Sequence, residues 1–331
     1  MVEVVIFAGE DDRHAEVVAA LLARGHGLRA AIVDTSTFPA QSRLGAEFTG
    51  AGPAFWFVDR HGQRIDLAEV RSFWWRRPQS FRLDPRIGDA QTQHFALQEA
   101  MSALWGVLRC CPGLWVNDIE HDQNADYKAR QLETMQRLGL NVPDTLITND
   151  PAAARAFYAR HGGEVVFKAF NQHGLLWQPT RRMQEADLAY LGLLDCAPVI
   201  FQRHVAGVRD IRATVVGGEV FATEFDIEAA GCVDHRLLID RTRCAPHRLP
   251  ETVARAVVGF VRALRLEYGC VDLRLTRGGE YVFFEVNTAG EFLYVEERTG
   301  QPIAAAVAAH LSGGRAACRP ARPALPEPVD A

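Results

Sequence analysis

Two short stretches near the C-terminus, joined by a Gly-Gly turn, constrain the fold of this chain most strongly. Gly269–Thr276 and Tyr281–Asn287 have the alternating pattern of β-strands, and the intervening Arg277–Glu280 is typical of a tight hairpin turn. If the two central glycines form a two-residue loop, Asp272 lies directly opposite Glu285. The turn therefore predicts both the hairpin and its register.

Alternation divides the side chains of this hairpin between an apolar and a polar face. The apolar face, which belongs in a core, comprises Val271, Leu273, Leu275, Val282, Phe284 and Val286; the polar face comprises Asp272, Arg274, Glu285 and Asn287. Two carboxylates roughly 5 Å apart at Cβ repel each other and destabilise a sheet, so a cation is expected between them. Because Asp, Glu and Asn offer the oxygen ligands that Mg²⁺ accepts, the pattern predicts a magnesium site at Asp272, Glu285 and Asn287.

Arg274 offers a simpler alternative, because it lies on the same face and could neutralise both carboxylates in a surface salt-bridge ladder. Three features favour the metal site: the position of Asn287 two residues after Glu285, the apolar opposite face, and two lysines upstream.

The composition is that of an ordinary globular protein. The 331 residues are 48% hydrophobic and 23% charged, which fits two or three domains, and the net charge of −5 argues against a general nucleic-acid-binding surface. The N-terminus does not resemble a secretory signal, no apolar run is long enough to cross a membrane, and the seven cysteines include no C-x-x-C pair. These features predict a cytoplasmic protein with reduced thiols and with neither nucleic-acid nor membrane partners.

The first 115 residues are predicted to form a small α/β domain, in which Gly9–Asp12 lacks the G-x-G-x-x-G pattern of a dinucleotide site. Within this domain Trp75, Arg76 and Arg77 precede a proline. These side chains could pack in the core with their charged ends reaching solvent. Alternatively, they form a surface that grips an acidic or extended partner.

The rest of the chain is predicted to form a central domain at 116–198, a C-terminal domain at 199–314 and a disordered tail at 315–331 that is rich in Arg, Pro and Ala. A continuous helical pattern runs from Asn117 to about Leu138. A second Gly-Gly hairpin is expected over 209–225.

A magnesium site indicates phosphate chemistry, because Mg²⁺ usually shares its ligand shell with substrate phosphates. Lys168 lies in the apolar strand pattern Val165–Phe170, where an unpaired charge is unfavourable. Lys128 lies on the upstream helical pattern, where a lone lysine is commonly solvated. Since the chain contains no G-x-x-x-x-G-K-[ST] sequence, a nucleotide is expected between sheets rather than on a glycine-rich loop.

Taken in order, these residues resemble the ATP-grasp carboxylate–amine ligases over roughly 117–311. The matching positions are Asn117, Lys128, Leu138–Thr145, Lys168, Phe201-Gln202, Asp210-Ile211-Arg212, Asp272-Leu273-Arg274 and Phe284–Asn287. Within that superfamily, Trp75–Pro78 and the long run Gly279–Asn287 are most similar to the microviridin-type, or graspetide, maturases, which macrocyclise ribosomal peptides. The resemblance implies an α/β (α+β) ATP-grasp fold with an N-terminal pre-ATP-grasp α/β domain and the nucleotide between two antiparallel sheets.

The resemblance also implies a role for each candidate residue. Contacts to ATP, through the phosphates or the adenine edge, would come from Lys128, Lys168, Gln202, Arg203 and Val205. Mg²⁺ would be held by Asp272, Glu285 and Asn287. The catalytic group, in which the arginines face the transferred phosphoryl group and the substrate carboxylate, would comprise Asp210, Arg212 and Arg274. Peptide contacts are expected near Trp75, Arg76 and Arg77.

The sequence departs from the family pattern at four places. Thr288 and Ala169 stand where proline is frequent, and Glu291 stands where an amide residue is common. The glycine-rich flap over the phosphates is reduced to Asn171–Gly174. None of these departures removes a predicted metal ligand, but they bear on substrate class and flap closure.

The function that the resemblance implies is an ATP-dependent, ADP-forming ligase acting on a precursor peptide with a leader and a core. Asp or Glu side chains of the core would become acyl phosphates and then ω-esters or ω-amides with Thr, Ser or Lys. A homodimer is also implied. Two alternatives stay open: a ligase that adds free amino acids to a peptide, protein or small acid, and an inactive ATP-grasp module that only binds peptide.

Overall fold

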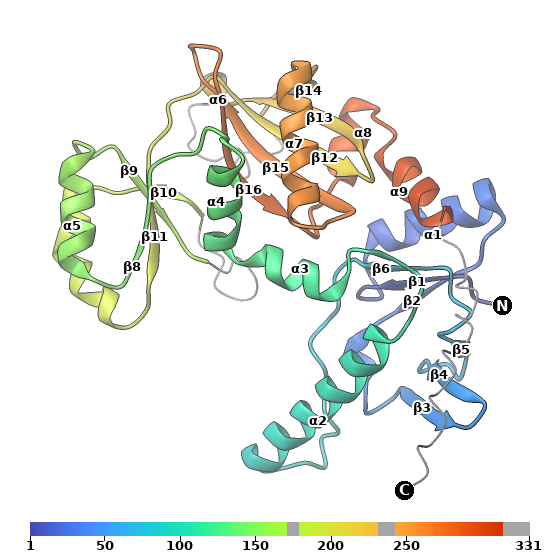
Figure 1. Ribbon diagram of the computed structural model, residues 1–331. Coiled ribbons are helices and arrows are strands. Elements are labelled where there is room, and N and C mark those ends of the chain that lie inside the picture. Colours follow the sequence, from blue (N-terminus) through green and yellow to red (C-terminus); the bar gives the residue numbers. More distant parts are fainter. Residues whose placement is uncertain (171–178, 231–241, 314–331) are drawn as a thin grey trace, which may run out of the picture. The chain divides into compact units, whose positions relative to one another are not determined.

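The computed structural model describes residues 1–170, 179–230 and 242–313. The chain divides into two compact units (Figure 1): Met1–Val116 together with the segment from Val307 onward, and Asn117–Ala306. The predicted tail and the predicted flap lie outside the described residues. No helix in the described ranges is long and apolar enough to cross a membrane. A further division of the second unit near residue 198 stays a prediction.

The first unit is built on a four-stranded parallel sheet, in which helices connect β1 to β2 and β6 to β7. The sheet order is β2 (Ala30–Val33), β1 (Val4–Phe7), β6 (Ser72–Trp75) and β7 (Leu114–Val116). The crossover helices are α1 (Arg13–His26) and α2 (Ala90–Arg109), and a short 3₁₀ turn, η1 (Thr35–Thr37), follows β2. Every residue of β1 and β6 is buried, as expected for central strands of a parallel sheet.

A small antiparallel sheet extends this unit between β2 and β6. It contains β3 (Arg43–Thr49), β4 (Gly52–Val58) and β5 (Arg64–Asp66). Trp56 of β4 lies across Gly45, where a Cβ atom would come within 2.0 Å of the indole ring. Arg64 covers Trp56, with its guanidinium carbon 4.4 Å from the ring centroid. Glycine is therefore required at position 45 for this sheet to pack.

The helical pattern from Asn117 to Leu138 forms two helices, not the single helix predicted. They are α3 (Ile119–Asp126) and α4 (Lys128–Arg137), separated by Tyr127, whose backbone is extended (φ −69°, ψ 111°). The break places Lys128 at the first position of α4. Asn117 precedes both helices, and its side-chain amide pairs with the backbone N–H and C=O of Tyr268 at 2.8 and 3.0 Å.

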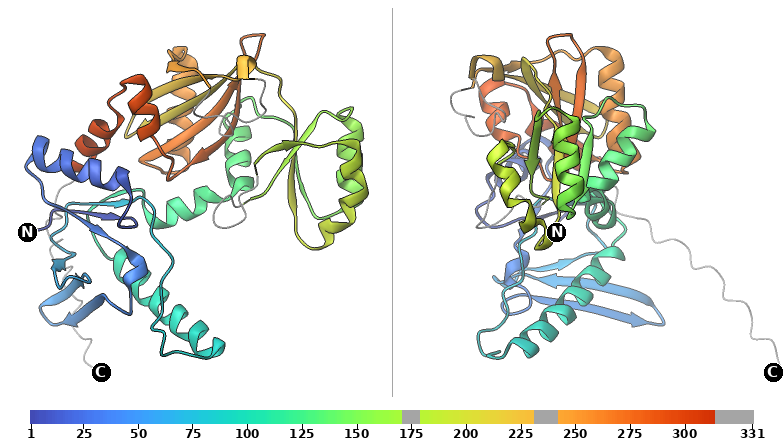
Figure 2. Two further views of the ribbon diagram at one scale, coloured as in Figure 1. Left: turned by 180° about the vertical axis from the view of Figure 1, so that it is seen from behind. Right: turned by 90° about the vertical axis from the view of Figure 1, so that its left-hand side faces the viewer.

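The second unit contains two antiparallel sheets, the first with four strands. Its order is β10 (Arg181–Arg182), β9 (Val165–Lys168), β11 (Val199–Arg203) and β8 (Thr145–Thr148). One face packs against α5 (Pro151–Arg160) and the 3₁₀ segment η2 (Glu185–Asp195) around Phe157, Leu191 and Phe201 (Figure 2). The polar side chains of Lys168 and Gln202 are consequently directed away from this apolar cluster.

The second sheet of this unit has five strands. Its order is β14 (Cys244–Pro246), β13 (Glu219–Asp226), β12 (Arg209–Val216), β15 (Tyr268–Leu275) and β16 (Tyr281–Asn287). Helix α7 (Glu251–Ala263) covers one face through a core that includes Ile211, Phe260 and Val271. The remaining helices are α6 (Ile227–Ala230), α8 (Leu293–Thr299) and α9 (Ile303–Ser312).

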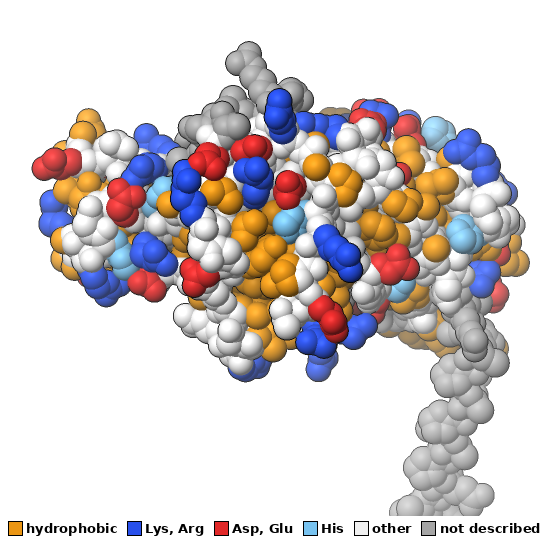
Figure 3. Space-filling model, turned by 90° about the horizontal axis from the view of Figure 1, so that it is seen from above, with side chains coloured by type: hydrophobic (Ala, Val, Ile, Leu, Met, Phe, Trp, Pro, Cys, Tyr) orange, Lys and Arg blue, Asp and Glu red, His pale blue; other side chains and the backbone are white. Residues whose placement is uncertain are grey.

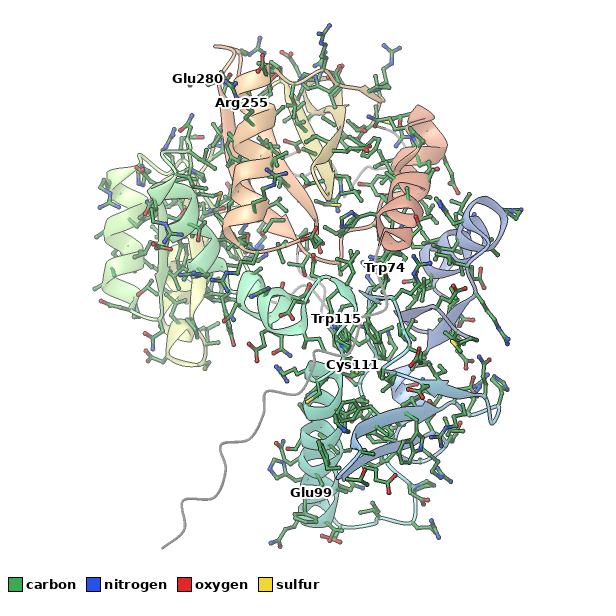
Figure 4. All side chains as sticks on the ribbon, turned by 45° about the vertical axis from the view of Figure 1, so that its right-hand side comes forward. Trp74, Glu99, Cys111, Trp115, Arg255 and Glu280 are labelled. Atoms are coloured by element: carbon green, nitrogen blue, oxygen red, sulfur yellow. The ribbon has the colours of Figure 1, made fainter. Side chains whose placement is uncertain are left out.

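The turn between β15 and β16 is one residue longer than predicted. Thr276 N donates to Glu280 O at 2.9 Å, so Arg277–Gly279 forms a three-residue loop in which Gly279 has a φ of 82°. Such a loop ends on a left-handed residue, a conformation that glycine adopts without strain. Glu280 marks this end of the hairpin in Figure 4.

A β-bulge compensates for the longer turn. The register shifts between Asp272 and Leu273, where Phe284 is the extra residue on β16, and Asp272 therefore lies opposite Glu285 as predicted. The predicted apolar face is wrong beyond this bulge. Phe283 takes the core position opposite Leu273, whereas Phe284 lies on the polar face.

Candidate functional site

A pocket in the second unit brings together most of the predicted nucleotide and metal residues. It lies between the four-stranded and the five-stranded sheets, and Lys168, Gln202, Arg203, Val205, Asp210, Asp272, Arg274, Phe284 and Glu285 are among its lining residues. Lys128 and Arg212 join this group through ion pairs with Glu285 and Asp272. Residues that are up to 157 positions apart in the sequence thus meet at one place.

Two lysines share one carboxylate at this pocket. Lys128 Nζ, from the start of α4, and Lys168 Nζ, from β9, each lie 3.2 Å from Glu285 Oε2 on β16. Lys168 is buried, and one carboxylate cannot neutralise two ammonium groups. The cluster therefore keeps an excess positive charge, which suits binding of a polyanion such as a triphosphate.

Asp272 is paired with a different cation. Arg212 Nη1, from β12, lies 3.0 Å from Asp272 Oδ1 and 3.4 Å from Oδ2. Burial lowers the pKa of Arg212, but the combined electrostatic effect of neighbouring groups, including Tyr294 and Asp272, outweighs burial. The pKa is therefore well above its ordinary value, and the guanidinium is charged. Its Nε is buried and has no hydrogen-bond partner in the described part of the chain. A buried, unsatisfied donor is unfavourable unless a ligand oxygen accepts from it.

Arg274 forms hydrogen bonds with Asp210 and with the backbone of Val205. Its Nε and Nη2 donate to the two carboxylate oxygens of Asp210 at 2.7 and 3.1 Å, and its Nη1 donates to Val205 O at 3.0 Å. Arg212, Lys128 and Lys168 provide the counter-charges for Asp272 and Glu285. The simple ladder built on Arg274 alone is therefore not the arrangement that the structure shows.

The oxygen donors at this site fit a hard divalent cation. Asp272 and Glu285 are cross-strand partners, and Asn287 follows two residues later on β16, where its Oδ1 accepts from Ala289 N at 3.0 Å. The described residues contain no cluster of three or more His, Cys, Asp or Glu side chains suited to a metal. A cation beside Asp272, Glu285 and Asn287 could take two carboxylates and one amide from the protein. This set leaves ligand positions for phosphate and water, as Mg²⁺ commonly requires.

Gly290 is a site residue that sequence reasoning missed. A Cβ atom at this position would lie 2.4 Å from Cys270 Sγ and 2.8 Å from Arg212 Nη2. The segment after β16 can therefore pack against Arg212 only because residue 290 has no side chain. The sequence signal was weak, since Gly290 is one of 27 glycines in the chain.

Thr288, one of the departures from the family pattern, has a partner that sequence reasoning also missed. Its side chain hydrogen-bonds to Asp122 of α3, which also accepts from Asn117 Nδ2 at 3.3 Å. Burial raises the pKa of Asp122 to about 6, against the opposing effect of these hydrogen bonds. Proline at position 288 could not make this contact, because it has no hydroxyl.

The structure corrects the expected peptide surface in the first unit. Trp75 is buried against Phe7 and Trp105, with ring centroids 5.1 and 4.9 Å away. Arg76 is also buried, at 1% exposure, and its Nε lies 3.5 Å from Asp12 Oδ2. Both side chains therefore belong to the core of this unit, and Figure 4 shows the neighbouring Trp74 and Trp115 in the same region.

Of the three predicted peptide-binding residues, Arg77 alone lines a polar cavity among the described residues. The cavity lies where β1, β2 and β6 end, and its other lining residues include Glu10, Asp34, Arg60 and Arg82. Ligands of open α/β sheets commonly bind beyond the carboxyl ends of the strands. Figure 3 shows acidic and basic side chains intermingled over one face of the molecule.

A pocket between two antiparallel sheets, in which Lys128 and Lys168 meet Glu285 and Arg212 meets Asp272, is the arrangement expected of an ATP-grasp ligase. Comparison with known proteins supports this class. Residues 3–123 match the family described as the MvdD pre-ATP grasp domain. No curated protein matches the chain.

Solved structures resemble the chain over nearly its full length. The macrocyclase MdnC from Microcystis aeruginosa MRC, bound with the precursor peptide MdnA, is 26% identical with a TM-score of 0.83, covering 94% of this chain and 99% of that one. The macrocyclase MdnB from the same organism is 28% identical with a TM-score of 0.77, covering 95% and 99%. The ATP-grasp ligase PsnB, complexed with minimal precursor, Mg and ADP, is 26% identical with a TM-score of 0.76, covering 93% and 96%.

These matches confirm the predicted resemblance and the predicted ATP-grasp fold with its N-terminal pre-ATP-grasp domain. The chain has the ATP-grasp fold and is an ATP-dependent ligase, and two of the solved structures that it resembles, MdnC and MdnB, are macrocyclases. The individual roles predicted for its site residues stay predictions.

Proposed function

We propose that this protein is an ATP-dependent macrocyclase of a ribosomally made precursor peptide. The observation that carries the proposal is the pocket in which Lys128, Lys168 and Arg212 surround Asp272 and Glu285. The similarity to a macrocyclase bound with its precursor peptide, over 94% of the chain, supports the choice of substrate.

The proposed reaction has two steps. A carboxylate oxygen of a peptide Asp or Glu attacks the γ-phosphorus of ATP, the bond to the β-phosphate oxygen breaks, and ADP leaves. A hydroxyl or amine of the same peptide then attacks the acyl carbon, inorganic phosphate leaves with the bonding electron pair, and the nucleophile loses its proton. The product is an ω-ester or an ω-amide.

The side chains of the pocket supply charge and position. Lys128 and Lys168, which pair with Glu285, would also contact the phosphates of ATP. The buried Nε of Arg212 would donate a hydrogen bond to an oxygen of the transferred phosphoryl group. Asp272, Glu285 and Asn287 would hold Mg²⁺, which neutralises phosphate charge when bound.

The base of the nucleotide would be recognised mainly by backbone groups. Gln202 donates its side-chain amide to Thr145 Oγ1 at 3.0 Å, so this amide serves to join β11 to β8. Gln202, Arg203 and Val205 line the pocket, and their backbone groups would contact the adenine edge.

The peptide is proposed to contact the first unit through Arg77 and the polar cavity around it. Arg82, from the same cavity, could pair with acidic side chains of the peptide. The five described cysteines are free thiols, which fits the proposed cytoplasmic location. A homodimeric state also belongs to this proposal.

Trapping of the acyl phosphate tests the activation step. Hydroxylamine added to enzyme, precursor peptide and Mg·ATP should convert activated Asp or Glu side chains into hydroxamates, which peptide fragmentation locates. If ADP forms without any peptide hydroxamate or crosslink, the peptide carboxylate is not the group activated. If neither ADP nor hydroxamate forms with the matching peptide, the protein is an inactive binding module.

A further inference from the structure

The loop that joins β11 to β12 is fixed by a side chain from β15. Arg274 forms a bidentate pair with Asp210 at 2.7 and 3.1 Å, and its third donor, Nη1, reaches Val205 O at 3.0 Å. Both partners of the pair are about 95% buried. A planar guanidinium suits this task because three of its N–H groups point in defined directions.

Packing around Arg274 restricts it further. A Cβ atom at Gly207 would lie 2.4 Å from Arg274 Cγ and 2.5 Å from Cδ, so the loop can lie directly on the arginine stem. The ring of Phe284, the bulge residue, has its centroid 5.4 Å from the guanidinium carbon. Val208 N also donates to Leu275 O at 2.9 Å. The guanidinium is thus held between the loop, Asp210 and an aromatic ring.

We propose that Arg274 and Asp210 are positioning residues that hold residues 204–208 in place, and that Arg274 does not bind the transferred phosphoryl group. This loop carries Val205, which lines the pocket beside Gln202 and Arg203. By fixing Val205 O, the pair determines where the backbone groups for the nucleotide base lie. The inference replaces the catalytic role that the resemblance implied for both residues, and it rests on the proposed function only in taking the pocket as the ATP site.

The two roles predict that the loss of nucleotide affinity depends differently on the number of phosphates in the nucleotide. A positioning residue acts on the base and ribose end of the nucleotide. Arg274→Lys should therefore weaken the binding of ADP and of the non-hydrolysable analogue AMPPNP by the same factor, about tenfold each. A residue that binds the γ-phosphate would affect AMPPNP alone. Isothermal titration of both nucleotides measures this directly. Lys168→Gln, which alters an expected phosphate contact, provides the comparison.

Gly207→Ala perturbs the same loop without altering a charge. This variant should also weaken the binding of ADP and AMPPNP equally. Hydrogen exchange at residues 204–208 should become faster in both variants, Arg274→Lys and Gly207→Ala, while β15 stays protected. Selective loss of AMPPNP affinity in Arg274→Lys, or unchanged exchange at 204–208 in both variants, would overturn the inference. Failure of the wild-type protein to bind either nucleotide would instead count against the proposed ATP site.

Discussion

Lys168 Nζ lies 3.2 Å from Glu285 Oε2, and this contact joins the four-stranded and five-stranded sheets of the second unit across the pocket. Lys128 approaches the same oxygen at the same distance. Glu285 is consequently the point at which the cationic and the metal-binding halves of the proposed ATP site meet.

Glu285→Gln should abolish Mg²⁺-dependent ATP turnover while leaving the fold intact, because the amide keeps the shape of the side chain but removes the charge that a cation needs. Turnover is measured as ADP release, and folding by circular dichroism. Glu280→Gln, at the exposed end of the same hairpin, is the matched control and should behave as wild type. Retained turnover in Glu285→Gln would refute the metal assignment.

Gly290→Ala should lower both stability and activity. The new methyl group would lie 2.4 Å from Cys270 Sγ and 2.8 Å from Arg212 Nη2, and such overpacking typically destabilises by about 1–3 kcal/mol. Urea unfolding and ADP release measure the two effects. Gly259→Ala in α7 meets no atom within 4 Å and should be neutral or stabilising by up to about 1 kcal/mol. Equal behaviour of the two variants would show that Gly290 is not a close-packing position.

Asp122 should make stability fall as pH rises from about 4 to about 6. Its pKa is raised to about 6 in the folded protein, from 3.8, so between these values the folded state holds the proton and the unfolded state has lost it. Asp122→Asn should therefore stabilise the protein at neutral pH by about 3 kcal/mol, and by roughly 1 kcal/mol less at pH 5. Urea unfolding at pH 5 and pH 7.5 checks this, and a pH-independent difference would contradict it.

Arg76 and Arg77 should respond differently to substitution despite being neighbours. Arg76→Ala removes a fully buried side chain beside Asp12 and should lower the melting temperature. Arg77→Ala, in the polar cavity, should leave the melting temperature nearly unchanged and weaken binding of the precursor peptide about tenfold. If Arg77→Ala binds the peptide as tightly as wild type, the cavity is not part of the peptide site.

The pairing of Asp272 with Glu285 could be predicted from the sequence because it depends on strand alternation and on the Gly-Gly turn. Asp272 and Glu285 lie opposite each other as predicted. The three-residue loop shifts the register by one residue, and the bulge at Phe284 shifts it back. Neither feature has a local signal that strand periodicity can detect.

The features that escaped prediction depend on tertiary packing. The extended backbone of Tyr127, between α3 and α4, follows no proline or glycine. The burial of Trp75 depends on Trp105 of α2, and the role of Arg274 depends on Asp210, which is 64 residues away. Such partners become visible only when the chain is folded.

The most direct test of the central claim is mass spectrometry of the matching precursor peptide after incubation with enzyme and Mg·ATP. The proposed macrocyclase predicts the loss of one water for each bond formed, with fragmentation blocked between the linked residues. A gain of one amino-acid residue mass would instead identify a ligase for free amino acids, and an unchanged peptide in the presence of ADP formation would contradict peptide modification altogether.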